Sequence, residues 1–553
     1  MLIRLNGKEK TYDNTVSVAQ VVQDLLPDQQ HLVLGCFCNG PVFELNHILR
    51  EGCDMQAITY QDEEGRRIYE RTLRFVMLLA VKRCFPGEQV RIEHSIGNGI
   101  YIILKNRRLY PHDVITIENT MRDIVQENMP LVKSRWSRDE AIDYFTKQGD
   151  LEKARLLSYR PYDYFNIYQC GGMAEYFYGA MLPTTGWVPV FALHPKTPGL
   201  VMLLPSKEDA NKPATFISQP KQMATFAQSN YWCRVLDCTD AADLNDLIKQ
   251  KKLRDFIRVN EALHDKSLSE IADDILVRGA RAIFISGPSS SGKTTFANRL
   301  SIHLRVNGLR PVLISMDDFY RNRDELPLEE DGKPDLEAMD ALDIPLLKQC
   351  LTSLMAGQNT QMPRFNFTTQ RQTREAYTLR IDHQQPLIIE GIHGLNPSLH
   401  EGFDPKMLFR IYISELTCLN LDNHNRIRTT DARLLRRIVR DYQFRNTSPL
   451  ETLALWDKVR RGEERWIFPY QENADMMFNS ALHYELPILK KLSFDLLHTI
   501  PKDSMHYLKS NRIIKILNYL LEAPEDIMDE IPPLSILREF IGGNTLYLSQ
   551  GDH

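Results

Sequence analysis

Short apolar runs alternate with longer amphipathic stretches in the second half of the chain. The apolar runs lie at 282–286, 311–315, 386–389, 408–413 and 476–478. Runs that are apolar at nearly every position are buried on both faces, so this rhythm predicts a parallel sheet covered by helices on both sides. Ligands of such sheets bind at the carboxyl ends of the strands, which makes the residues just after each run the candidates for function.

The first half follows other patterns. Residues 1 to about 60 alternate apolar and polar positions around a helical run at 18–26, and a unit from about 66 to 205 opens with a helical pattern at 73–85 and continues with strand-like segments at 90–93 and 100–104. The stretch after it is polar and locally helical, and the chain again looks helical from about 486 to its end. We predict a multidomain α/β protein with units at 1–62, 63–205, 206–276 (a helical connector), 277–485 and 486–553.

Composition narrows the class of partner. The 553 residues carry a net charge of −5, which gives no overall attraction to nucleic acid and favours a small substrate, although a local basic patch is compatible with it. The nine cysteines form no CxxC pair, so reduced, structural thiols are expected. The chain starts without a signal-peptide-like run and has no apolar stretch of about 18 residues. We expect a cytoplasmic protein without a membrane span. The sequence is also compatible with a homo-oligomer.

A glycine-rich loop follows the first apolar run. The segment 287–295, GPSSSGKTT, matches GxxxxGK[ST] in full and precedes a helical pattern from about 294 to 306, a context that a chance glycine-serine turn would lack. Such a loop aims backbone N–H groups at phosphate oxygens, while its lysine bridges the β- and γ-phosphates and the next hydroxyl binds Mg²⁺. ATP and Mg²⁺ are therefore the expected cofactors. The candidate residues are Gly287, Ser289, Ser290, Ser291, Gly292, Lys293, Thr294 and Thr295.

Carboxylates follow two further runs. Asp317 and Asp318 come after 311–315, and Glu390 comes after 386–389. A carboxylate there can accept the proton of an acceptor hydroxyl or serve the metal. If the strand persisted, only one of the adjacent aspartates would face the cleft; an acidic helix N-terminus is the alternative reading. His393 is a weaker candidate, because a lone histidine near a turn is more often structural.

Ten arginines lie between 426 and 465, seven of them within 426–445. On a helix Arg433, Arg437 and Arg440 share one face, and Arg445 follows it. This stripe suits a lid over a polyphosphate, and a solvated basic face or an RNA-contacting surface are the alternatives. No NKxD motif follows the loop, which disfavours a GTPase.

Six sequence pieces, in order, resemble the uridine kinase and phosphoribulokinase family over about 280–482. They are GPSSSGKTT, MDDFY, MDALD, MPRFNF, IIEGIH and TDAR with the arginines after it. The resemblance implies that Asp317 is the base for a ribose 5′-hydroxyl, that Thr294 and Glu390 serve Mg²⁺ together with Asp317, and that Asp340 holds sugar hydroxyls. It also implies a phosphate and lid role for Arg437, Arg440 and Arg445.

Two positions depart from the family's pattern. Uridine kinases have a tyrosine where Phe365 stands, and a histidine that reads the pyrimidine falls near Gln370. The expected substrate residues are therefore Asp340, Phe365, Gln370 and His393, with an altered set for base recognition.

The first 205 residues resemble the N-terminal half of threonyl-tRNA synthetase. Residues 1 to about 60 are similar to its TGS domain, a β-grasp unit, and about 66–205 to its editing domain. That editing domain uses two histidines on one helical turn and a Cys-x3-His pair. Here Phe75, Leu79, Cys170 and Ala174 stand at those positions, and apolar side chains can neither activate water nor bind a metal. The resemblance thus implies a fold retained for binding, regulation or dimerisation.

These observations predict a kinase that phosphorylates a hydroxyl of a small metabolite, and the first hypothesis for the acceptor is the 5′-hydroxyl of a nucleoside. A kinase of a sugar phosphate or pantothenate-like alcohol is the second hypothesis. The third is an ATP-gated RNA-binding protein, which the global charge disfavours.

Overall fold

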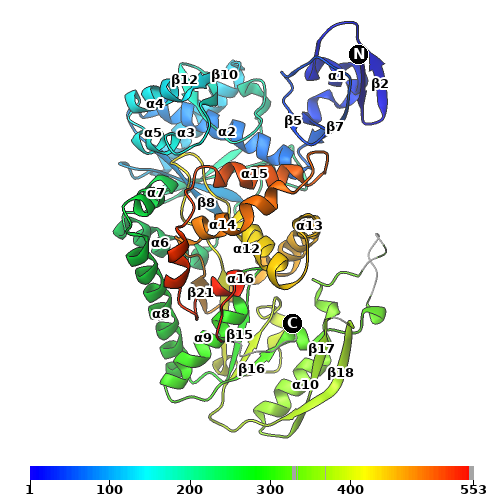
Figure 1. Ribbon diagram of the computed structural model, residues 1–553, viewed down its shortest axis with the longest axis vertical. Coiled ribbons are helices and arrows are strands. Elements are labelled where there is room, and N and C mark those ends of the chain that lie inside the picture. The colour runs from blue at the N-terminus through cyan, green and yellow to red at the C-terminus, as the bar shows by residue number, and fades with distance from the viewer. Residues whose placement is uncertain (327–331, 333, 368, 547–553) are drawn as a thin grey trace.

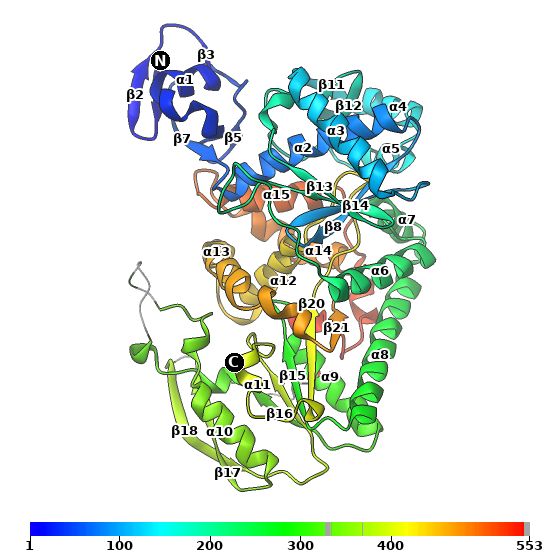
Figure 2. The ribbon, with the colours of Figure 1, turned by 180° about the vertical axis from the view of Figure 1, so that it is seen from behind.

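The computed structural model describes residues 1–326, 332, 334–367 and 369–546. Figures 1 and 2 show a small sheet unit projecting at the N-terminal end, a large parallel sheet at the opposite end, and the helices α12, α14 and α15 between them. The multidomain α/β class predicted from the sequence is confirmed. The residue limits of the units stay predictions.

The N-terminal sheet has the strand order β2-β1-β7-β4-β5. β1 runs parallel to β7 and antiparallel to β2, and α1 (Val18–Leu25) buries Val18, Val21 and Val22 in the core beneath the sheet. This helix confirms the run predicted at 18–26. The sheet's strands are β1 (Leu2–Leu5), β2 (Lys8–Thr11), β4 (Val33–Cys38), β5 (Val42–Phe43) and β7 (Cys53–Thr59), while β3 (Val16–Ser17) and β6 (Ile48–Leu49) pair with each other separately.

The next unit is organised around α2 (Glu63–Cys84), which is buried along most of its length. It packs with α3 (Pro111–Glu127), and the predicted helix at 73–85 is its C-terminal half. Two antiparallel sheets have the orders β13-β14-β9-β8 and β10-β11-β12. Their bounds, with two short helices, are β8 (Val90–Ile96), β9 (Gly99–Leu104), β10 (Val132–Ser137), α4 (Arg138–Lys147), α5 (Leu151–Leu157), β11 (Tyr164–Cys170), β12 (Met173–Glu175), β13 (Ala192–Lys196) and β14 (Gly199–Leu203).

The predicted connector contains α6 (Pro220–Val235), α7 (Ala241–Lys249) and α8 (Leu253–Arg278). α8 runs along α9 (Lys293–Val306), where Arg299 Nη2 lies 2.7 Å from Asp265 Oδ1. Its buried aliphatic side chains, including Ile257 and Ile271, belong to the same core as the parallel sheet. A polar sequence with few aromatic residues therefore still builds a covering helix, because one aliphatic face suffices.

All five apolar runs of the second half form one parallel sheet in the order β16-β19-β15-β20-β21. The strands are β15 (Ala282–Ser286), β16 (Val312–Ser315), β19 (Leu387–Glu390), β20 (Leu408–Ser414) and β21 (Met476–Asn479). β15 is central, so the loop after it lies between the ends of β19 and β20. The remaining elements are α10 (Ile344–Met355), the hairpin β17 (Thr360–Asn366) and β18 (Arg371–Leu379), α11 (Pro397–His400), α12 (Thr429–Phe444), α13 (Pro449–Trp466), α14 (Glu485–His498), α15 (Tyr507–Leu517) and α16 (Arg538–Ile541).

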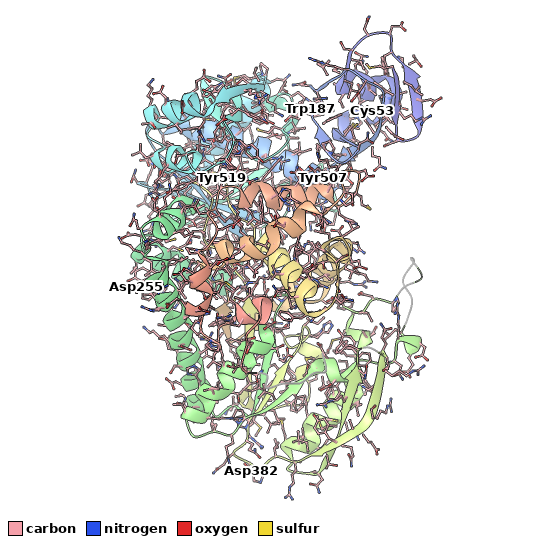
Figure 3. The ribbon with its side chains drawn as sticks, in the orientation of Figure 1. Cys53, Trp187, Asp255, Asp382, Tyr507 and Tyr519 are labelled. Carbon is pink, nitrogen blue, oxygen red and sulfur yellow. The ribbon has the colours of Figure 1, made fainter. Side chains whose placement is uncertain are left out.

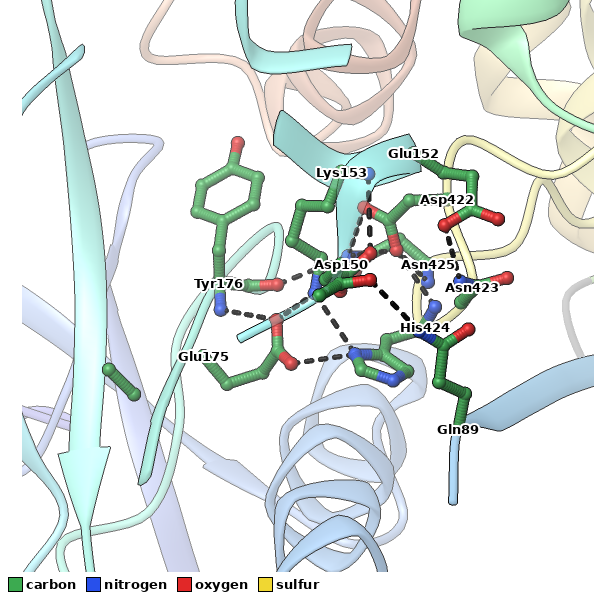
Figure 4. A network of polar contacts seen from close by, with 12 residues as sticks. Gln89, Asp150, Glu152, Lys153, Glu175, Tyr176, Asp422, Asn423, His424 and Asn425 are labelled. Atoms are coloured by element: carbon green, nitrogen blue, oxygen red, sulfur yellow. Dashed lines mark hydrogen bonds and ion pairs between the residues drawn. The ribbon is translucent and has the colours of Figure 1, made fainter. Parts of the chain in front are cut away.

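A buried polar network joins the loop before α12 to the N-terminal half (Figure 4). Lys153 is fully buried and ion-paired with Glu175, whose second oxygen lies 2.6 Å from His424 Nδ1. Asn425 Nδ2 donates to the Tyr176 carbonyl at 3.1 Å, and Arg428 pairs with Glu70 of α2. Since a buried charge must keep its partner to be tolerated, these contacts fix the start of α12 against the N-terminal half.

Two aromatic side chains labelled in Figure 3 mark further junctions. Trp187 packs against the cores of both the N-terminal sheet and the α2 unit. Tyr519, just beyond α15, contacts the Tyr176 hydroxyl and accepts a hydrogen bond at its carbonyl from Asn245 Nδ2 at 2.7 Å. Tyr519 thus packs the C-terminal extension onto the α2 unit and onto the helical connector.

No helix within the described ranges is long and apolar enough to cross a membrane. All nine cysteines are free thiols, and seven of them are buried.

Candidate functional site

The phosphate loop follows β15 as predicted. A Cβ placed on Gly287 would lie 2.0 Å from the Ile413 carbonyl oxygen, and one on Gly292 would lie 2.4 Å from Ile536 Cγ2. Gly292 also has φ +84°, in the left-handed region that glycine adopts at no cost. The two glycines of the motif are therefore required by close packing as well as by the turn.

Polar groups in the loop fit a phosphate ligand. The Ser290 and Ser291 hydroxyls are buried and have no hydrogen-bond partner among the described residues. Lys293 Nζ donates to the carbonyl oxygens of Gly287 at 2.9 Å and Pro288 at 3.2 Å, so that the ammonium spans the loop. Unpaired buried hydroxyls are costly and call for a partner, and phosphate oxygens would provide acceptors for them.

Two carboxylates stand beside the loop. Glu390 ends β19, where its Oε1 lies 3.4 Å from Thr294 Oγ1 and 3.2 Å from Ser315 Oγ. Asp317 follows β16 and lies close enough to Lys293 and Arg445 for both cations to favour its ionised form. The strand ends of β15, β16 and β19 thus bring together Lys293, Thr294, Asp317 and Glu390.

Burial controls the ionisation of both acids. It raises the pKa of Asp317, against the opposing effect of Lys293. Burial and the nearby Asp317 charge raise the pKa of Glu390 to about 7. Two carboxylates that resist shared ionisation form a site at which a divalent cation would be favourable, since its charge offsets their repulsion.

The side chains of Asp317 and Asp318 have different neighbours, as expected, but the strand does not continue through them. The chain turns into a 3₁₀ segment at 316–319, and Asp318 Oδ1 accepts a hydrogen bond from the Phe365 amide at 3.3 Å. The rings of Tyr320, Phe365 and Phe367 lie together beside it, with centroids 5.1 to 6.3 Å apart. Asp318 therefore orients an aromatic group, and Asp317 alone of the pair neighbours the loop lysine.

The other candidate substrate residues are placed as follows. Gln370 Oε1 accepts from Arg323 Nη1 at 2.8 Å. Asp340 is exposed in a short 3₁₀ segment at 339–341, and this stretch pairs with the chain beside Tyr320. His393 is only 1% exposed, its ring faces Trp466, and burial lowers its pKa to about 4. Their roles toward a substrate stay predictions.

The arginines of α12 divide into two groups. Arg433 is buried, and its Nη1 lies 2.5 Å from Glu463 Oε1 and donates to the Ser289 carbonyl at 2.9 Å. It therefore supports the phosphate loop from beneath, whereas the sequence predicted it on the same accessible face as Arg437 and Arg440. Arg437 Nη1 donates to Ser289 Oγ at 2.8 Å. The Asp441 carboxylate forms ion pairs with Arg437 Nε at 3.1 Å and with Arg440 Nη2 at 2.8 Å. Arg445 Nη1 lies 3.8 Å from the same carboxylate.

Three acids at this site were not among the sequence candidates. Asp441 gathers the arginines, and it does lie within the family-like arginine segment. Glu463 Oε1 accepts from the Ser289 amide at 3.0 Å, and Glu539 Oε2 accepts from Thr295 Oγ1 at 2.7 Å. The last two come from helices remote in sequence, so that no local motif marks them.

The cavity of the α2 unit has another chemistry. It measures ≈ 550 Å³ and is lined by Met129, Pro130, Val132, Tyr144, Gln169, Cys170, Gly171, Gly172, Met173 and Ala174. Phe75 and Leu79 are buried at 0% and 2% exposure. Among the described residues no group of three or more His, Cys, Asp or Glu side chains is arranged to hold a metal ion.

Comparisons with known proteins divide the chain in the same way. Residues 282–486 match the family described as "Phosphoribulokinase / Uridine kinase family". The N-terminal part is 30% identical over 195 residues to threonine–tRNA ligase of Methylobacillus flagellatus, covering 35% of this chain and 31% of that protein. The enzyme of Nitrosomonas europaea is 28% identical over 263 residues, covering 47% and 40%. The chain therefore spans about a third of the length of the first of these relatives.

Solved structures that align with part of the chain include two described as kinases. One is described as a possible uridine kinase from Bacillus stearothermophilus, 20% identical, covering 41% of this chain and 100% of that one, with a TM-score of 0.27. Another is a putative fructose transport system kinase from Silicibacter, 18% identical, covering 38% and 98%, also with a TM-score of 0.27. On the sequence comparisons, residues 282–486 match the model of the phosphoribulokinase and uridine kinase family, and the part before them is similar to threonine–tRNA ligases.

Proposed function

We propose that this protein transfers the γ-phosphate of ATP, with Mg²⁺, to a hydroxyl of a small metabolite, and that the 5′-hydroxyl of a nucleoside is the preferred acceptor. The observation that carries the proposal is the meeting of Lys293, Thr294, Asp317 and Glu390 at the ends of three neighbouring parallel strands. A phosphate-binding loop alone serves many activities. A carboxylate beside its lysine adds a group that can receive a proton from an attacking hydroxyl.

The loop and the metal ligands would position the nucleotide. Backbone amides of 287–295 and the Lys293 ammonium would hold the phosphates, and the two orphan serine hydroxyls would donate to them. Thr294, Glu390 and Asp317 would hold Mg²⁺, which supplies charge neutralisation at the transferring group. Phosphoryl transfer needs little covalent help, so this positioning accounts for most of the catalysis.

Asp317 would act as the general base. It must be ionised to accept the acceptor's proton, and burial works against this. The positive charges of Lys293 and Arg445 favour its ionised form, so the same cations that bind phosphate keep the base active.

The arginines after 436 would stabilise the charge on the transferring group. Asp441 holds Arg437 and Arg440 at the loop, and Arg445 lies at the exposed end of α12. An arginine at that place can bring its guanidinium over the phosphates, where its fork of donors matches their oxygens.

The aromatic group of Tyr320, Phe365 and Phe367 favours a planar acceptor. It adjoins the Asp317–Asp318 turn through the hydrogen bond of Asp318 to the Phe365 amide. Flat rings stack on nucleobases with a gain of about 1–3 kcal/mol per base, whereas a sugar phosphate would gain little from them. A nucleoside would stack its nucleobase on these rings while its 5′-hydroxyl faces Asp317.

An acceptor panel tests the proposal. Purified full-length protein is incubated with labelled ATP, Mg²⁺ and, in separate reactions, pyrimidine nucleosides, purine nucleosides, sugar phosphates and pantothenate-like alcohols. We expect ADP release and a labelled 5′-monophosphate with at least one nucleoside. Phosphorylation of a sugar phosphate or of the pantothenate-like alcohol alone would retain the kinase and overturn the acceptor; label transferred to none of them would contradict the activity.

A further inference from the structure

The C-terminal extension covers the phosphate loop. Figure 1 shows α16 beside α12 and the end of β15. Ile536, Leu537 and Phe540 are each 0% exposed, and the Phe540 ring lies 5.1 Å from the Arg436 guanidinium. Ile536 fills the space above Gly292, the second glycine of the loop. This segment lies beyond the 282–486 region that matches the kinase family, so the family resemblance does not account for it.

Glu539 reaches from this segment to the first turn of α9. Its Oε2 accepts hydrogen bonds from the Thr295 amide at 3.3 Å and from Thr295 Oγ1 at 2.7 Å. Asn544 Nδ2 donates to the same hydroxyl at 3.3 Å. The amides of a first helical turn lack partners within the helix and bind anions, and here a side-chain carboxylate is that anion.

The position matters because it belongs to the nucleotide site. Thr295 closes the GPSSSGKTT loop, whose amides would face the phosphates. One N–H cannot donate fully to a carboxylate and to a phosphate, and the two anions would repel each other at this distance. Glu539 also adds negative potential at Glu390, which indicates that its charge is felt across the metal site.

The backbone of the segment is not free to leave. Ser535 Oγ donates to Glu261 Oε1 of α8 at 2.6 Å, and Arg538 Nη2 donates to the Met528 carbonyl at 2.6 Å. Moving the whole of α16 would expose its buried apolar side chains to water, which is unfavourable. A movement of the Glu539 side chain alone would leave these residues buried. A rotation of that side chain would release the Thr295 amide.

We propose that Glu539 is an internal competitor of the nucleotide phosphates: its carboxylate occupies the Thr295 amide and hydroxyl, and it must turn away before a nucleotide is fully bound. The residue thereby sets a lower affinity for nucleotides than the loop alone would have. This inference rests on the proposed function in one respect, that the loop binds a nucleotide.

Calorimetric titration of the full-length protein with ADP and with adenosine, both in the presence of Mg²⁺, tests it. Glu539→Gln keeps the shape and removes the charge, and we expect it to bind ADP about tenfold or more tightly, because a hydrogen bond to a charged group is replaced by a weaker one. Adenosine has no phosphate, so its affinity should change by less than about twofold. Glu525→Gln is the matched control, since the Glu525 side chain is 95% exposed in the same extension and its Oε1 lies 3.5 Å from Lys491 Nζ in an exposed ion pair.

The outcomes separate this inference from the proposed function. Equal or weaker ADP binding by Glu539→Gln, with normal binding by the unmodified protein, would overturn the competitor role and leave the kinase proposal standing. Equal tightening toward ADP and adenosine would also overturn it, because the effect would then not involve phosphate. If neither protein bound ADP, both proposals would fail. Glu539→Ala serves as a second variant should the glutamine form fail to fold, with the same expected tightening.

Discussion

The phosphate loop and the cavity around Cys170 differ in the number of buried polar and charged groups that converge on them. At the loop, orphan serine hydroxyls, an ammonium and two carboxylates converge on one place. Around Cys170 the lining is mostly apolar, and the nearby helix α2 buries Phe75 and Leu79 in the core of its unit. A site poised for chemistry keeps costly groups unsatisfied, whereas a fold retained for packing replaces them with side chains that stabilise it.

Replacing the proposed base gives the largest expected effect on activity. Asp317→Asn keeps the size and removes the acceptor of the proton, so turnover should fall by about 10²- to 10⁴-fold. The ATP dissociation constant, measured by calorimetry, should change little. Asp324→Asn is the control, because Asp324 is exposed and pairs only weakly with Arg371 at 3.4 Å. Unchanged turnover in Asp317→Asn would refute its role.

The second prediction concerns the stability of the other region. Phe75 is fully buried and packs near Phe177, with ring centroids 6.5 Å apart. Phe75→Ala should lower the free energy of unfolding by about 3–5 kcal/mol, measured by urea titration with a probe in the N-terminal half. Ile115→Ala, at a 60% exposed position on α3, should cost less than about 0.5 kcal/mol. Similar losses in both would mean that Phe75 is not a core residue.

Asp441 offers a sharper test of the loop region. Asp441→Asn removes the charge that holds Arg437 and Arg440, so these guanidinium groups should lose their fixed positions at the loop. We expect kcat/KM for ATP to fall by at least about tenfold, which corresponds to about 1.4 kcal/mol. Asp457→Asn, which affects a half-exposed partner of Lys509 on the neighbouring helix, is the control. A fall no larger than that of the control would show that the arginines need no such anchor.

The smallest effect is expected at the cavity itself. Cys170→Ala should leave turnover within about twofold, because Cys170 lines a cavity outside the phosphate loop and burial raises the pKa of its thiol. The same kinase assay measures it. A loss of turnover comparable with that of Asp317→Asn would break the distinction between the two regions.

Much of the kinase-like region could be predicted from the sequence. Every apolar run became a strand of one parallel sheet, because runs buried on both faces leave few alternatives, and Lys293, Asp317 and Glu390 meet there because strand ends share an edge. The loop residues could be identified from the motif alone, because a side chain at Gly287 or Gly292 would clash with neighbouring atoms and these positions therefore require glycine.

Other features depended on long-range packing. The role of α8 in the sheet's core, the pairing of Arg433 with Glu463 and the reach of Glu539 to Thr295 join residues 30 to more than 200 positions apart. No local periodicity or motif encodes such contacts. The side of a helix that an arginine occupies also decides its role, as the buried Arg433 and the partly exposed Arg437 show.

Calorimetric titration of the full-length protein with ATP and Mg²⁺, alongside Lys293→Ala, tests the central assignment most directly. We expect the unmodified protein to bind one nucleotide and the variant to lose about tenfold or more in affinity, since the ammonium that spans the loop is gone. Absence of ATP binding by the unmodified protein, or equal binding by the variant, would contradict the assignment of the loop as the nucleotide site.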